Sequence, residues 1–235
     1  MDTNQRFLKA ITSSFNSFLD VGTSRSTAKL HPLHGFVAEE LAQRLGPAYV
    51  IKSQGYGKGK EATMTGRYVD KKVDITILKN KKPIAGVAVK FVMQNYKQNS
   101  NNYFENMLGE TANIRSNNLP YFQIFIIFDN LPYYNKSKEL KHWEELSMHN
   151  IGKYIVLSQD NTEVFMHTPN KTLFFVVHLP KNEDLKTQEE FVDYYRSKNY
   201  SLTISNKAFG RFSSSVILND METFMNKIYH TILSL

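Results

Sequence analysis

The chain has 235 residues, of which 41% are hydrophobic, 13% aromatic and 22% charged, a composition typical of one globular domain. It contains no cysteine, which excludes disulfide bonds, a thiol nucleophile and a cysteine-bound zinc site. Its formal net charge of +7 indicates either general solubility or a polyanionic partner such as nucleic acid.

Nothing in the sequence predicts a membrane segment. No stretch approaches the roughly 20 apolar residues of a bilayer-spanning helix, and the first residues are polar where a signal peptide would be apolar. A helix with one face of Lys and Arg, as expected for binding at a membrane surface, is also missing. We therefore expect a cytoplasmic protein with no membrane partner.

Helices and strands alternate in the first half of the chain, as the spacing of apolar residues predicts. The expected elements in chain order are a helix over 3–19, a loop over 20–35, a helix over 36–45, a strand over 48–54, a loop over 55–68, and strands over 72–78 and 84–92. The last two strands are joined by a short Lys-rich turn and are expected to pair as a hairpin.

The second half continues this alternation around one strongly apolar strand. The expected elements are a helix over 101–118, a strand over 121–128, a helix over 136–149, strands over 153–158 and 172–179, and helices over 187–198 and 219–235. Thr187 and Glu190 form a capping-box pattern at one helix start. We expect one α/β domain over 1–235, with a mixed central β-sheet flanked by helices and with 175–235 as a candidate peripheral subdomain.

Two residues of opposite charge interrupt apolar strands. Asp74 lies in "KVDITIL", and Lys90 lies in "IAGVAVKFV". Such a residue is ordinarily a surface position on an edge strand, whereas a buried charge needs a partner because burial without one is costly. On neighbouring strands, Asp74 and Lys90 are expected to be buried and to partner each other.

These two strands together resemble the core motif of the restriction-endonuclease-like nucleases, the PD-(D/E)xK superfamily. In that motif an aspartate on one strand precedes an acidic residue, a spacer and a lysine on the next. Asp74 and Lys90 match the aspartate and the lysine, and Val89 matches the spacer. Ala88 stands where the family has glutamate or aspartate, and Val73 stands where it often has proline. The helix and the apolar strand that follow have the order of the family's core.

The resemblance implies cleavage of a phosphodiester bond with Mg²⁺ as the cofactor. Asp74, a carboxylate at position 88 and the backbone carbonyl of Val89 would hold the cation, since Mg²⁺ prefers oxygen ligands. The cation would polarise the phosphate and lower the pKa of a water molecule. Lys90 would orient that water and stabilise the charge that develops at phosphorus.

Ala88 needs an explanation, because a methyl group cannot bind Mg²⁺. The favoured one is an alanine that replaces a natural glutamate and leaves the chain catalytically impaired. A second is a carboxylate supplied by the next helix, with Glu105 preferred to Glu110. A third is a relic site in a DNA-binding protein, ranked last because a relic would also lose Lys90.

Two other groups of residues contain side chains that can bind a cation. Glu39 and Glu40, on the helix over 36–45, are candidates for binding a second cation, although a solvated helix face is the favoured explanation for each of them. His31 and His34 lie close together in a predicted loop, without a metal-binding helix pattern or neighbouring cysteines. The sequence therefore argues against a histidine metal site.

Two polar segments flank the motif and are candidates for contact with DNA. The loop over 55–68 and the residues after it combine glycines with basic side chains, which can approach phosphates closely. The segment over 93–103 is rich in amide side chains, which pair well with adenine. The candidate DNA-binding residues are Lys58, Lys60, Arg67, Lys71, Gln94, Asn95, Tyr96, Lys97 and Asn101.

We therefore expect a type II restriction endonuclease that cleaves double-stranded DNA at a palindromic sequence in the cytoplasm of a prokaryote. A homodimer is expected, because two-fold protein symmetry matches the two-fold symmetry of such a site. One alternative is a repair, recombination or mobile-element nuclease of the same superfamily, which would read DNA structure. Another is a basic DNA-binding protein without catalytic activity.

Overall fold

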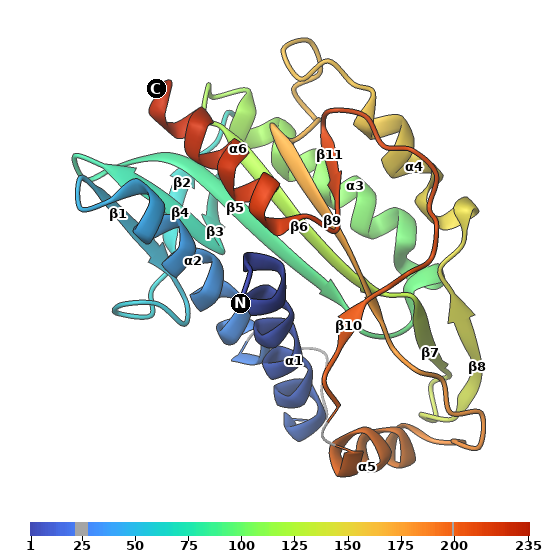
Figure 1. Cartoon of the computed structure of the whole chain (residues 1–235). Helices are drawn as coiled ribbons and strands as arrows, with labels where there is room; N and C mark the ends of the chain where they lie inside the picture. Colours follow the sequence, from blue (N-terminus) through green and yellow to red (C-terminus); the bar gives the residue numbers. More distant parts are fainter. Residues whose placement is uncertain (22–27, 199) are drawn as a thin grey trace.

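Residues 1–21, 28–198 and 200–235 are described by the computed structural model of the chain, which Figure 1 shows as a β-sheet flanked by helices. The helices are α1 Thr3–Val21, α2 His31–Leu45, α3 Tyr96–Arg115, α4 Met148–Ser158, α5 Gln188–Lys198 and α6 Met221–Leu233, with a short 3-10 helix, η1 Ala28–Leu30, before α2. The strands are β1 Tyr49–Ser53, β2 Ala62–Thr65, β3 Asp70–Val73, β4 Ile75–Lys79, β5 Lys82–Val92, β6 Tyr121–Phe128, β7 Asn130–Tyr134, β8 Leu140–Glu145, β9 Lys171–His178, β10 Thr203–Ile204 and β11 Val216–Leu218.

The main sheet is mixed. Its strands follow the order β1, β4, β5, β6, β9 and β10, and β11 pairs with β9. β4 is antiparallel to β1 and β5, whereas β6 is parallel to β5 and β9. All eight residues of β6 are buried, as expected for a strand in a sheet that is covered on both faces. The prediction of an α/β chain with a mixed central sheet flanked by helices is confirmed.

Helices cover both faces of the sheet (Figure 1). On one face, where α1, α2 and α6 pack together, Phe224 of α6 lies 6.5 Å from Phe122 of β6, measured between ring centroids. On the other face, Tyr154 of α4 lies 5.3 Å from Phe125 of the same strand. Successive residues of a strand point to opposite faces, so β6 contributes aromatic side chains to both layers.

The predicted hairpin is formed by β4 and β5. Asn80 and Lys81 connect the two strands, and both have positive φ angles, 52° and 63°. This backbone conformation belongs to a two-residue type I′ turn, whose twist matches that of an antiparallel strand pair. An irregularity between Ile77 and Leu78 then shifts the pairing by one residue, so the turn and this shift together place Lys90 of β5 relative to β4.

A strand was missed inside the loop predicted over 55–68. Strand β2 lies there and pairs with β3, and the two form a separate two-stranded ribbon. Met64 and Val73 of this ribbon are buried against α3 and β6, a contact that the local sequence does not reveal. The strand predicted over 72–78 is therefore two strands, β3 and β4, which separate at Asp74.

Two predicted elements in the middle of the chain are wrong. Residues 136–149, predicted as a helix, contain strand β8, which pairs with β7. Glu144 of β8 is buried and accepts hydrogen bonds from the backbone N–H groups of Tyr96 (2.8 Å) and Lys97 (3.2 Å) at the start of α3. Such a long-range cap outweighs local helix propensity.

Residues 153–158, predicted as a strand, are the second half of α4. The buried residues of α4 are Asn150, Ile151, Tyr154, Leu157 and Ser158. Their helical spacing is visible only when the first turn of the helix is counted with the second half.

Most other predicted elements are confirmed within a few residues, including the start of α5. The Thr187 hydroxyl accepts a hydrogen bond from the N–H of Glu190 at 3.2 Å. The carboxylate of Glu190 binds the N–H of Lys186 rather than that of Thr187. Only one half of the expected capping box is therefore present.

Two boundaries also differ from expectation. Of the loop predicted over 20–35, residues 22–27 lie outside the described residues, and α2 begins inside it at His31, with Pro32 in its first turn. Residues 175–235 do not form a peripheral subdomain, because β9 lies inside the sheet and α6 contacts β9, α1 and α2. In the part of the chain that the structure describes, no helix is long and apolar enough to cross a membrane.

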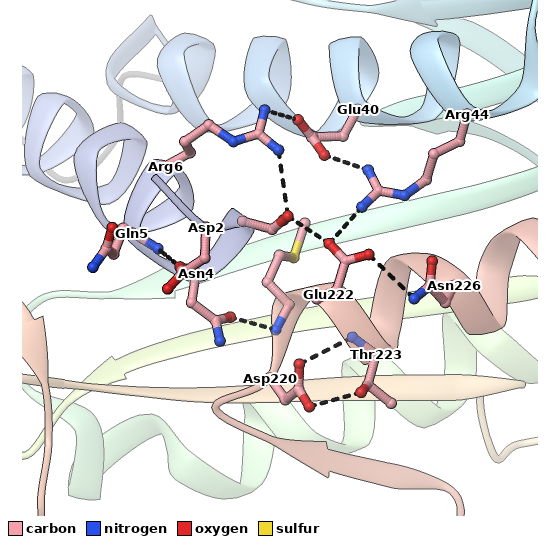
Figure 2. A network of polar contacts seen from close by, with 12 residues as sticks. Asp2, Asn4, Gln5, Arg6, Glu40, Arg44, Asp220, Glu222, Thr223 and Asn226 are labelled. Atoms are coloured by element: carbon pink, nitrogen blue, oxygen red, sulfur yellow. Dashed lines mark hydrogen bonds and ion pairs between the residues drawn. The ribbon is translucent and has the colours of Figure 1, made fainter.

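A buried carboxylate joins α1, α2 and α6 (Figure 2). Glu40 of α2 is 2% exposed and forms ion pairs with Arg6 of α1 and Arg44 of α2. Arg44 also pairs with Glu222 of α6 at 2.7 Å, and Glu222 accepts a hydrogen bond from the Thr3 hydroxyl at 2.5 Å. Because a buried charge is stable only with its partners in place, this network fixes the three helices relative to one another.

Glu40→Gln is expected to lower the free energy of unfolding by about 3 kcal/mol, since it leaves two guanidinium groups without their buried partner. Urea denaturation followed by circular dichroism measures the loss. Glu39→Gln is the matched control, because Glu39 is exposed and contacts only Gln43 through a hydrogen bond of 3.3 Å among the contacts described. Equal losses for the two variants would contradict a structural role for the network.

Candidate active site

Asp74 lies between β3, the second strand of the ribbon, and β4, with which the chain enters the main sheet. The last pair between β4 and β5 joins Ile75 to Val87, so the backbone of β4 does not reach the next N–H group of β5. The Asp74 carboxylate takes that place, and its Oδ2 accepts a hydrogen bond from the N–H of Val89 at 2.7 Å. This bond holds the carboxylate at the start of β4, beside the strand that carries Lys90.

A cavity of about 400 Å³ opens beside this carboxylate, between β5, β6 and α3. Ala88 and Lys90 face it from β5, as their two-residue spacing predicts, and Phe125 faces it from β6. Its polar lining residues are Lys71, Asp74, Lys90, Asn106, Glu110 and Gln123. The structure therefore brings Asp74, Ala88 and Lys90 together, as the sequence predicted.

The expected burial and pairing of Lys90 are wrong. Its side chain is exposed at the opening of the cavity, and no ion pair joins it to Asp74 in the described structure. Its Nζ lies 4.5 Å from the centroid of the Tyr103 ring, a cation–π contact. Partial loss of solvent lowers the pKa of Lys90, while Asp74 and Glu110 act in the opposite direction. The ammonium is thus free to contact a ligand in the cavity.

Glu110, and not Glu105, is the carboxylate that α3 contributes to the cavity. Glu110 forms an ion pair with Lys71 and accepts a hydrogen bond from the Tyr121 hydroxyl at 3.4 Å. Glu105 is exposed, does not line the cavity, and its charge acts on Lys153. The preference for Glu105 is therefore wrong, because the register of α3 turns that residue away from β5.

Glu61 and His34 approach Asp74 from outside the cavity. Glu61 precedes β2 and Asp74 follows β3, and Ala62 pairs with Val73 between them, so the two carboxylates face each other across the base of the ribbon. His34 extends toward them from α2. One ligand atom from each of His34, Glu61 and Asp74 lies within 4.8 Å of the other two.

Each of these three side chains has a perturbed pKa. Burial lowers the pKa of His34 to about 4, with a smaller contribution from His31. Burial raises the pKa of Asp74 to about 6, against the opposing hydrogen bond from Val89. Burial also raises the pKa of Glu61, and the negative charge of Asp74 raises it further. A neutral imidazole beside two crowded carboxylates is the state that binds a cation.

The residues fit a divalent cation. His34 is 2% exposed, and neither of its ring nitrogens has a hydrogen-bond partner among the described residues, an arrangement that is costly unless a ligand is bound. Ligand atoms around one such ion lie roughly 3 to 4 Å apart, given bond lengths near 2.1 Å. Shifts below about 1 Å would bring the three side chains onto one ion.

The other proposed cation ligands lie elsewhere. Glu40 is committed to the helix network and Glu39 faces solvent, so neither reaches Asp74. Glu61 was not predicted as a ligand because the loop that contains it was not recognised as part of a ribbon. His34 was predicted to lie in a loop, and a metal site there was considered unfavourable. Pro32, which is favoured in a first helical turn, was the signal that could have placed His34 on α2.

The candidate DNA-binding residues divide into two groups. Lys58, Lys60, Arg67, Lys97 and Asn101 are exposed, Gln94 is half-buried, and Lys71 is committed to Glu110. Asn95 and Tyr96 are not available for DNA. Asn95 is bonded through its side-chain oxygen and nitrogen to the backbone of Tyr134, at 2.8 and 3.0 Å, and Tyr96 is 1% exposed. The cause is that α3 starts at Tyr96, inside the segment predicted as a loop.

Asp74→Asn is expected to stabilise the protein at pH 7.5 by about 2 kcal/mol. Folding raises the pKa of Asp74 from its ordinary value to about 6, so stability falls as the pH rises through this interval, and the amide removes the penalty. Urea denaturation at pH 7.5 and pH 4.5 measures the gain, which is expected to shrink at the lower pH. Asp70→Asn, at an exposed position of β3, is the control. An Asp74→Asn variant less stable than the wild type at pH 7.5 would contradict the destabilising effect assigned to the ionised carboxylate.

Comparisons with protein-family models, with curated proteins and with solved structures find no match for the chain. The chemistry of this site is therefore inferred from the residues that form it.

Proposed function

We propose that the protein is a metal-dependent nuclease whose active site is built around Asp74. The observation that carries this proposal is the position of Asp74 between a set of cation ligands on one side and a cavity with an exposed lysine on the other. His34 and Glu61 provide the ligands, and Lys90 provides the ammonium. In phosphodiester hydrolysis a divalent cation activates the attacking water and polarises the phosphate, and a positive side chain stabilises the charge that develops on the phosphate.

The order of elements around the site supports the resemblance to restriction-endonuclease-like nucleases. The antiparallel pair β4–β5 carries Asp74 and Lys90, helix α3 follows, and β6 then returns parallel to β5. This is the order expected from the resemblance. We therefore include a restriction-endonuclease-like core in the proposal.

The roles of the residues follow from their positions. A bound cation would polarise the phosphate and make a water molecule more acidic. Asp74 and Glu61 supply the negative charge that holds it, and His34 supplies a neutral nitrogen ligand. Lys90, at the opening of the cavity, would contact a phosphate oxygen and stabilise the charge that develops there. The hydrogen bond from Val89 keeps Asp74 in position while substrate enters.

The site supports a new reading of Ala88. An alanine substituted for a natural glutamate is not needed to explain the motif, because Glu61 and His34 approach Asp74 from other elements and Glu110 shares the cavity. We infer that the missing carboxylate is supplied from elsewhere in the chain. This is the second explanation drawn from the sequence, with different residues from the one preferred there.

The substrate that we propose is double-stranded DNA. The net charge of +7 and the exposed basic residues near the ribbon, which include Lys58, Lys60 and Arg67, favour a polyanion. Cleavage at a palindromic sequence by a homodimer, as in type II restriction endonucleases, is the finer proposal and rests on the resemblance. A repair, recombination or mobile-element nuclease is the second candidate and would not yield discrete fragments.

The wild-type chain is expected to cleave supercoiled plasmid DNA in the presence of Mn²⁺ or Mg²⁺. Asp74→Ala and Lys90→Ala are expected to reduce the rate by about 100-fold or more, because each removes a group that contacts the cation or the phosphate. Gel electrophoresis measures the rate, and discrete fragments from a phage genome would identify a sequence-specific enzyme. Circular dichroism checks that both variants fold.

Three further variants separate the explanations of Ala88. Glu110→Gln is expected to lower the rate, and Glu105→Gln, on the same helix but outside the cavity, to leave it unchanged. If the chain is instead impaired by a lost glutamate, only Ala88→Glu will cut DNA. Absence of cleavage by all forms with either cation would refute the nuclease proposal.

The cation site is expected to prefer Mn²⁺ to Mg²⁺, because an imidazole nitrogen is a better ligand for a transition metal than for Mg²⁺. His34→Ala is expected to weaken Mn²⁺ binding at least tenfold. The difference between the affinities for Mn²⁺ and Mg²⁺ is expected to become smaller. Isothermal titration calorimetry measures both affinities. His31→Ala is the control, since His31 bonds to Gln54 at 2.8 Å and lies outside the ligand group. Unchanged Mn²⁺ affinity in His34→Ala would exclude His34 as a ligand.

A further inference from the structure

The tip of the β2–β3 ribbon exposes an aromatic and an aliphatic side chain to solvent. Tyr68 is 77% exposed and Val69 is 63% exposed, and both lie in the turn between the two strands. Arg67 is also exposed, and its guanidinium carbon lies 5.8 Å from the centroid of the Tyr68 ring. Neither apolar side chain contributes to the core of the molecule.

The backbone of this tip is held rigidly by one side chain of α3. The Asn113 oxygen accepts hydrogen bonds from the N–H groups of Tyr68 (2.9 Å) and Val69 (3.2 Å), and its nitrogen donates to the Val69 carbonyl (2.8 Å). The Asn113 carbonyl accepts a further bond from the N–H of Arg67 at 2.8 Å. A Cβ atom on Gly66 would come within 2.1 Å of the Asn113 amide, so only glycine allows this close approach.

The rest of the ribbon is fixed as well. Asn117 donates a hydrogen bond of 2.7 Å to the carbonyl of Thr65, where β2 ends. On the inner face, Met64 and Val73 are buried against Ile114 of α3. An exposed turn of this kind would ordinarily be mobile, so the clamp holds Tyr68 in a defined place.

The ribbon connects this tip directly to the proposed active site. Glu61 and Asp74 stand at its base, and four residue pairs separate them from the turn. At about 3.3 Å per residue, the tip lies roughly 13 to 17 Å from the two carboxylates. This corresponds to about four or five nucleotides of a DNA strand in a duplex, at roughly 3.4 Å each.

We propose that Tyr68 inserts at a base step of the bound DNA and stacks on the nucleobase it exposes, a few nucleotides from the cleaved bond, with Arg67 on the adjacent phosphate. The inference rests on the proposed nuclease function and adds a contact that positions the strand. An aromatic face accepts any base, because every base has a π-face. A clamped aromatic ring binds at lower entropic cost than a mobile one. The ribbon therefore sets the distance between a stacked base and the cation, independently of sequence.

Binding of fluorescein-labelled DNA without added metal, measured by fluorescence anisotropy, tests the proposal on single strands and duplexes. Tyr68→Ala is expected to weaken binding about tenfold, and Tyr68→Phe to bind like the wild type, because the ring is retained. The slope of log affinity against log salt is expected to stay unchanged in Tyr68→Ala and to fall by about one in Arg67→Ala. Tyr133→Ala is the control, since it removes the same side chain from the β7–β8 hairpin, at the other end of the molecule (Figure 1).

A second readout locates the stacked base. A 2-aminopurine placed at successive positions of the oligonucleotide is expected to change fluorescence at one position with the wild type and Tyr68→Phe, and at none with Tyr68→Ala. If Tyr68→Ala binds DNA as the wild type does, the stacking proposal is refuted and the nuclease proposal stands. If the wild type binds no DNA at all, the nuclease proposal fails first.

Discussion

The hydrogen bond from the Val89 N–H to the Asp74 carboxylate is the constraint on which the proposed site depends. It exists because the chain passes from the ribbon into the main sheet one residue before β4 pairs with β5, which leaves an N–H group without a backbone acceptor. A buried N–H group without a partner is costly, so the side chain is drawn into the gap. The carboxylate is itself buried in this position, and the loss of water raises its pKa to about 6.

Two clusters of ionisable side chains in this chain differ in whether the chain itself supplies their partners. Glu40 is as buried as His34, but it has two arginine partners and closes a network that joins three helices. His34, Glu61 and Asp74 are also crowded, yet no cation among the described residues pairs with them within ion-pair distance. Ionisable groups whose partners lie within the chain stabilise the fold, whereas buried groups without such partners are candidates for a ligand site.

The sequence predicted elements well where one strand or helix carries its own pattern. The buried strand β6 is a continuous apolar run, and the helices α1, α5 and α6 have clear periodicity. Asn80 suits the first position of the hairpin turn, whereas Lys81 takes a positive φ angle that usually favours glycine. Strand β8 was predicted as a helix because its decisive contact, Glu144 at the start of α3, joins residues far apart in the chain. The ribbon strand β2 was missed for the same reason, since its stability comes from burial against α3.

The sequence by itself indicated that Ala88 and Lys90 share one face of a strand next to the one that carries Asp74, because side chains of a strand alternate between its faces. Which residue of β5 lies opposite Asp74 was decided by an irregularity between Ile77 and Leu78 that shifts the pairing by one residue. Only the tertiary structure decided which side chains accompany them. His34 approaches from a helix and Glu61 from the base of the ribbon, and neither distance is encoded in local spacing. The tertiary structure also decided the surroundings of Lys90, because α3 places the Tyr103 ring beside its ammonium at the opening of the cavity.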